Sequence, residues 1–148
     1  MRDSLYSEML KLASGEPGLL FRGGNPINKN HDYEPSWDYE VDEEPPPNLA
    51  RMATEVSKHF FQELKSKKII DNWMMGFEVW AANLQDTGAV AMYISGTHDW
   101  PVVLIDLRQH IGYEDQIGKS LHHELIHAVQ EAKEEEFNED EAEDDLAI

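Results

Sequence analysis

Residues 102–131, with the sequence VVLIDLRQHIGYEDQIGKSLHHELIHAVQE, change from a β-branched run to a helical pattern. The run over residues 102–107 is typical of a strand. Acidic residues at 114 and 115 stand where the positive end of a helix favours them, so we expect a helix from there to about residue 131. Its apolar residues fall on one stripe, which is expected to pack against the core: Ile117, Leu121, Leu125 and Ala128.

Two more runs rich in β-branched and aromatic residues stand upstream, over residues 73–84 and 89–95. Turn-forming residues separate the three runs at 86–88 and 96–101. This pattern predicts three hairpin-linked strands in a small antiparallel sheet.

Helices are also expected before the sheet. Residues 3–14 have apolar side chains at three- and four-residue spacing, which predicts a short opening helix. A longer helix is predicted from Asn48, a residue that can cap it, to about Lys68. Its apolar residues repeat along one face: Leu49, Met52, Val56, Phe60 and Leu64. The predicted fold class is therefore α+β, with a small antiparallel sheet of about three strands packed on helices.

The chain has 148 residues, which fits a single domain over residues 1–148. Its formal net charge is -18, and acidic residues gather in a proline-rich segment at 23–47, expected to be a loop, and in a C-terminal segment at 131–148. Such a surface repels phosphates and anionic lipids, so we expect no direct binding of nucleic acid or membrane. No run approaches the ~20 apolar residues of a membrane span, and a cytoplasmic protein is expected.

The helix expected over residues 114–131 carries His123-Glu124-Leu125-Ile126-His127. Two histidines four residues apart lie about 40° apart around a helix and roughly 6 Å along it, so both imidazoles can reach one metal ion. Both lie opposite the apolar stripe. Glu124 follows the first histidine and can act as general base on a water at the metal. Zn²⁺ is the expected cofactor; the structural alternative is a helix with histidines on its surface.

The segment Leu121-His122-His123-Glu124-Leu125-Ile126-His127-Ala128 resembles the HExxH zinc metallopeptidases, the zincins, and the resemblance covers about residues 89–143. It implies a zincin-like fold in which a β-hairpin precedes the active-site helix. The edge strand of that hairpin would pair with an extended peptide substrate. Residues 89–95 would then be the edge strand and residues 102–107 the inner strand. Backbone pairing of this kind holds a peptide with little choice of sequence.

The third zinc ligand decides the branch of the superfamily. A metzincin would have glycine at 130 and histidine at 133, but Gln130 and Lys133 stand there, and no histidine follows His127. The remaining ligand is therefore expected to be a carboxylate, as in the gluzincins.

Residues 138–143, NEDEAE, resemble the Glu-x-x-Ala/Ser-Asp element of the gluzincins. The resemblance implies Glu139 as the third metal ligand and Glu143 as an acceptor that orients a histidine. Eleven residues separate His127 from Glu139, which is shorter than the usual gluzincin spacing. Two alternatives to Glu139 therefore stay open: Glu143 is the third ligand, or the acidic residues of this segment are simply solvated and bind no metal.

Other polar side chains stand near the predicted cleft. His122 points about 100° away from His123 around the helix. It is therefore expected to lie on the surface or to contact a metal ligand rather than the metal itself. Four residues are candidates for stabilising an oxyanion, although such side chains are more often simply packed or exposed: Tyr93, His98, His110 and Tyr113.

The sequence thus predicts a zinc metallopeptidase with Glu124 as its catalytic base and a protein or peptide as its substrate. The acidic flanks favour a partner with a basic surface. The alternative is an acidic interaction or inhibitor protein whose surface mimics nucleic acid, with a structural or vestigial HExxH motif.

Overall fold

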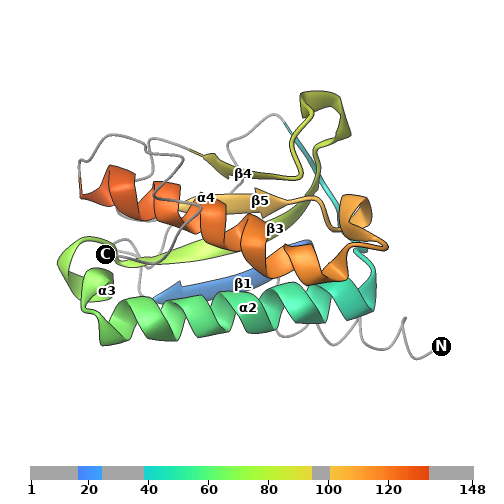
Figure 1. Ribbon diagram of the computed structural model, residues 1–148. Coiled ribbons are helices and arrows are strands. Elements are labelled where there is room, and N and C mark those ends of the chain that lie inside the picture. The colour runs from blue at the N-terminus through green and yellow to red at the C-terminus, as the bar shows by residue number, and fades with distance from the viewer. Residues whose placement is uncertain (1–16, 25–38, 95–100, 134–148) are drawn as a thin grey trace.

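The computed structural model describes residues 17–24, 39–94 and 101–133. They form an α+β fold in which two long helices lie side by side on one face of a mixed sheet (Figure 1). The helix expected over residues 3–14 lies outside the described residues. In the part that the structure describes, no helix is long and apolar enough to cross a membrane.

The two long helices are α2 (Pro47–Ser66) and α4 (Ile117–Ala132). The first begins one residue before Asn48 because Pro47 occupies the first helical position, where a missing N–H leaves no hydrogen bond unmade. A 3-10 turn, η3 (Glu114–Gln116), precedes α4, so the two acids expected in the first helical turn lie in η3. The described residues also form three shorter helical elements: α3 (Ile69–Asn72), η1 (Gln85–Thr87) and η2 (Leu107–His110).

The sheet contains five strands: β1 (Leu19–Gly24), β2 (Glu40–Val41), β3 (Gly76–Asn83), β4 (Ala91–Ile94) and β5 (Val102–Ile105). Their order is β1-β3-β5-β4, and β2 pairs with β3 beside that path. The strands β3 and β5 are parallel, whereas the other pairs are antiparallel. The antiparallel pairing expected between the second and third runs is confirmed by β4 and β5. The rest of the expected three-stranded antiparallel sheet is wrong, because the sheet is mixed and β3 pairs in parallel with β5 rather than in a hairpin with β4.

Burial explains this order. All four residues of β5 are buried, so the strand suits a central position with both faces covered. Most residues of β4 are only partly buried, which suits an edge. The strand β4 therefore forms one edge of the sheet and β5 lies inside it, which are the positions expected for these two segments.

Regular structure interrupts the segment expected to be an acidic, proline-rich loop at 23–47. Its first two residues end β1, residues 40 and 41 form β2, and Pro47 begins α2. The strand β1 forms because a short apolar run, Leu19-Leu20-Phe21, pairs with the long buried strand β3. Similarly, the acidic segment at 131–148 begins inside α4, which ends at Ala132.

The main hydrophobic core lies between the helices and the sheet. The helix α2 contributes Ala53 and Leu64, and Phe77 of β3 lies beneath the two helices. The apolar stripe expected on α4 is confirmed, since each of its residues is at most 1% exposed: Ile117, Leu121, Leu125 and Ala128. This burial holds α4 against β4 and β5, so the opposite side of the helix lies beside the sheet edge.

Candidate metal centre

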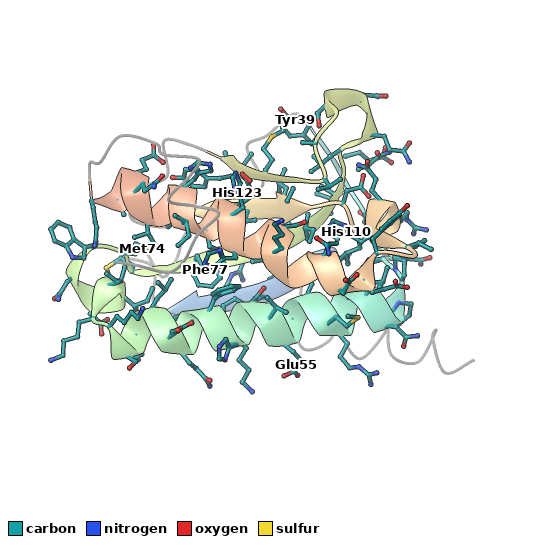
Figure 2. The ribbon with its side chains drawn as sticks, viewed as in Figure 1. Tyr39, Glu55, Met74, Phe77, His110 and His123 are labelled. Atoms are coloured by element: carbon teal, nitrogen blue, oxygen red, sulfur yellow. The ribbon has the colours of Figure 1, made fainter. Side chains whose placement is uncertain are left out.

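His123 lies on the side of α4 toward β4 (Figure 2), and the ring of His127 faces it from one helical turn further on. Their Nε2 atoms are 3.2 Å apart, and the two rings are nearly perpendicular, at 89°. Two imidazole nitrogens that share one tetrahedral zinc at about 2.0–2.1 Å lie about 3.3–3.4 Å from each other. The separation of the two Nε2 atoms therefore fits two donors to one metal ion, and it also fits a hydrogen bond between the two rings.

Glu124 lies between these histidines and the edge strand. Its Oε1 accepts a hydrogen bond from the backbone N–H of Tyr93 over 3.1 Å. Its Oε2 is 4.0 Å from Nε2 of His123. The carboxylate therefore has one oxygen on the sheet edge and the other beside the histidine pair.

A cleft of about 240 Å³ opens beside the motif. It lies between the start of β4 and the outer side of α4, so solvent and small groups can reach His123 and Glu124. The residues that line it come from these two segments and from η3: Val90, Ala91, Gln116, Lys119, Ser120, His122, His123 and Glu124.

His127 has a partner that sequence reasoning did not find. Its Nδ1 lies 3.2 Å from Oε1 of Gln130, a fully buried side chain one helical turn further on. The sequence did contain a signal for this contact. Gln130 is a polar residue that follows the apolar Ala128-Val129, and its spacing of three residues from His127 brings the two side chains together on a helix.

The backbone N–H of Tyr93 was also missed, because sequence reasoning considered only the Tyr93 side chain. That side chain packs in the main core and is 9% exposed. Tyr93 acts on the site through its backbone N–H, which donates to Glu124, a residue that lines the cleft.

The other candidate side chains have different surroundings. His122 packs on Phe60 of α2, with 5.4 Å between ring centroids, as well as lining the cleft. His110 is buried: its Nδ1 is 2.7 Å from the carbonyl oxygen of Asp106, and its Nε2 is 2.9 Å from Oγ of Ser120. Tyr113 is 65% exposed, and His98 lies outside the described residues.

The predicted carboxylate ligand, Glu139, and its alternative, Glu143, also lie outside the described residues. Within residues 17–24, 39–94 and 101–133, no three or more His, Cys, Asp or Glu side chains gather in a way that could hold a metal ion. The described part of the site therefore offers two candidate donors, His123 and His127. A catalytic zinc site has three protein ligands, so a zinc ion here would need a third one.

Comparisons with protein-family models, with curated proteins and with solved structures found no match to this chain.

Proposed function

We propose that this protein is a zinc-dependent metallopeptidase with a zincin-like arrangement of edge strand and HExxH helix. The observation that carries the proposal is the pair of Nε2 atoms 3.2 Å apart on α4, with the Glu124 carboxylate beside it. This separation supports the proposal because it is close to the distance between two imidazole donors on one zinc ion.

His123 and His127 would hold the zinc, with Glu139 as the third ligand and Glu143 as the alternative. Imidazole and carboxylate are ordinary zinc ligands, and the chain has no cysteine to compete with them. When bound, zinc polarises a substrate carbonyl and lowers the pKa of a water molecule toward neutrality.

Glu124 acts as the general base in this proposal. It accepts a proton from the attacking water and returns it to the leaving amine, which is the role that a carboxylate next to the first histidine can perform. Support comes from its position: one oxygen is already directed toward the histidine pair.

The outer edge of β4 is the proposed binding surface for an extended peptide. The carbonyl of Val90 accepts a hydrogen bond from the N–H of Asp106. The backbone N–H and C=O groups of Val90 and of every second residue after it in β4 therefore face β5. Ala91 and Tyr93 therefore direct their backbone groups outward, beside the cleft. A peptide strand that pairs there is held mainly by backbone hydrogen bonds, so the substrate class is an unfolded or extended polypeptide segment.

Metal content tests the proposal first. The protein is purified without added metal and analysed by mass spectrometry, together with His123→Ala, His127→Ala and the matched control His122→Ala. We expect about one zinc per chain in the wild type and in the control, and loss of zinc in the other two variants. Metal-free wild type that refuses added zinc would overturn the proposal and leave the acidic interaction protein as the better hypothesis.

Activity is then tested on a mixed peptide library with the zinc-loaded protein and with Glu124→Gln. The variant keeps an oxygen to accept the Tyr93 N–H but cannot take a proton, so it should retain zinc and lose about 10²–10⁴-fold in rate. Equal cleavage by both proteins would exclude Glu124 as the base.

A further inference from the structure

We infer that Gln130 is a positioning residue that sets the tautomer and the ring orientation of His127. The inference rests on the proposed function in one respect, namely that the orientation of His127 serves to bind a metal ion. The tautomer and orientation of the His127 ring are properties of the metal-free protein and can be measured without metal.

The chemistry of the contact determines which nitrogen carries the proton. An amide oxygen can only accept a hydrogen bond, so with Oε1 of Gln130 placed 3.2 Å from Nδ1 of His127, we infer that Nδ1 is the donor. A neutral ring has one N–H, and therefore Nε2 of His127 has a lone pair. That lone pair points toward Nε2 of His123, at the place where two imidazole donors to one ion have to meet.

Burial makes this contact effective. Gln130 is fully buried and His127 is 6% exposed, so water competes poorly for the His127 Nδ1 proton. A buried amide without partners would lose the hydrogen bonds it makes in water, which favours keeping the contact. Gln130 thus accepts the hydrogen bond that many metal-binding histidines donate to a carboxylate or a backbone carbonyl from the ring nitrogen that does not bind the metal.

His110 provides an internal reference for the measurement. Its Nδ1 is 2.7 Å from a backbone carbonyl oxygen, that of Asp106, so this ring must also carry its proton on Nδ1. The Asp106 carbonyl is independent of Gln130. A substitution at position 130 should therefore change the tautomer of His127 and leave that of His110 unchanged.

The experiment is nitrogen-15 NMR of the imidazole rings in metal-free protein at a pH where the rings are neutral. In the wild type we expect His127 and His110 both in the Nδ1–H form. Gln130→Leu should move His127 toward the Nε2–H form, while Gln130→Glu, which keeps an oxygen acceptor, should restore Nδ1–H. A wild-type His127 in the Nε2–H form would overturn the inference without any substitution, and so would an unchanged His127 spectrum in Gln130→Leu.

Zinc affinity gives the second readout, by competition with a chelator of known affinity. Loss of the partner behind a metal-binding histidine weakens metal binding about 10–100-fold, so Gln130→Leu should bind zinc that much more weakly and Gln130→Glu should recover most of the loss. Equal zinc affinity in the wild type and the leucine variant would overturn the inference. A wild type that binds no zinc would refute the proposed function, and the NMR result would then decide the role of Gln130 by itself.

Discussion

The backbone N–H of Tyr93 donates a hydrogen bond to Oε1 of Glu124, over 3.1 Å and across 31 residues of sequence. This contact joins the outer edge of the sheet to the helix that carries the histidines. It uses the same outward-facing N–H that an added peptide strand would need, so Glu124 and a bound peptide compete for one donor. In the free protein, the carboxylate is held in place by the edge strand.

Amide hydrogen exchange measures this contact directly. Glu124→Ala removes the acceptor of the Tyr93 N–H, and a hydrogen bond worth about 1 kcal/mol corresponds to a several-fold change in exchange rate. We expect the Tyr93 amide to exchange about 5- to 10-fold faster in Glu124→Ala and at nearly the wild-type rate in Glu124→Gln. The control is the Met92 amide, which faces β5 and should not respond. An unchanged Tyr93 rate in Glu124→Ala would mean that the contact is not formed in solution.

The burial of α4 predicts the stability of the whole site. Leu125 is 1% exposed in the main core, between the two motif histidines in sequence. Leu125→Ala should lower the free energy of unfolding by about 2–5 kcal/mol, because it leaves a cavity in addition to losing apolar burial. Urea unfolding gives the value. The exposed Lys119→Ala on the same helix should change it by less than about 0.5 kcal/mol, and equal effects would contradict the packing of α4.

Gly24 closes β1 against β3 in a conformation that other residues avoid. Its φ is +100°, it pairs with Gly76, and a Cβ would overlap the carbonyl oxygen of Met75. Gly24→Ala should therefore destabilise the protein by about 3 kcal/mol or more, from backbone strain and steric overlap together.

Gly88→Ala is the matched control for this prediction. Gly88 also has a positive φ, +77°, but a Cβ there meets nothing within 4 Å. Only the backbone strain remains, about 1–2 kcal/mol. Thermal or urea unfolding of both variants should show the larger loss at position 24, and the reverse order would refute the tight approach of β1 to β3.

Arg108 ties η2 to the segment that follows β2. Its Nε donates to Oδ2 of Asp42 over 2.7 Å, and its Nη2 donates to Oδ1 of Asp42 and to the carbonyl oxygen of Glu44. The hydrogen bond to Asp42 raises the pKa of Arg108. A raised pKa contributes stability that is fully present below the pKa of arginine in the unfolded chain and is lost only as the pH rises through the higher folded pKa.

Arg108→Met should therefore cost about 1 kcal/mol of unfolding free energy, a modest amount because the pair is partly solvated. The cost should be the same at about pH 6 and about pH 9, since Arg108 stays charged across that range. Urea unfolding at both values measures it, with the exposed Arg51→Met on α2 as the control. If the cost of the substitution were smaller at about pH 9 than at about pH 6, another titrating group would control the contact.

Zinc should stabilise the folded protein if the proposed function is right. A ligand that binds only the native state adds about 2.7 kcal/mol at a free concentration of one hundred times its Kd. We expect a chelator to lower the Tm of the zinc-loaded wild type and of His122→Ala, and to leave the Tm of His127→Ala unchanged. A chelator effect of the same size in all three proteins would place the metal somewhere other than the histidine pair.

Local periodicity determined much of the candidate site. The stripe Ile117, Leu121, Leu125 and Ala128 marks one side of α4 for burial, and the four-residue spacing of His123 and His127 places both rings on the other side. Both relationships follow from helix geometry, whatever the helix packs against. The edge position of residues 89–95 and the inner position of residues 102–107 were expected from the resemblance to zincins, and β4 and β5 have these positions in the sheet.

Tertiary structure decided the relationships between segments far apart in the chain. Leu19-Leu20-Phe21 is too short a run to predict a strand, and it becomes one because β3 offers a buried partner. The parallel pairing of β3 with β5, rather than a hairpin with β4, depends on which pairing buries more apolar surface over the whole sheet.

The candidate site also combines features that follow from local sequence with features that depend on the tertiary structure. The sequence by itself determined that His123, Glu124 and His127 share a helix and that the two histidines lie opposite its apolar stripe, because helical periodicity depends only on residues close together in the chain. Only the folded chain decided that Tyr93 meets Glu124 and that Gln130 is fully buried behind His127. Contacts between strands and helices depend on the packing of all of them together, and side chains such as Gln130 take their burial from that packing.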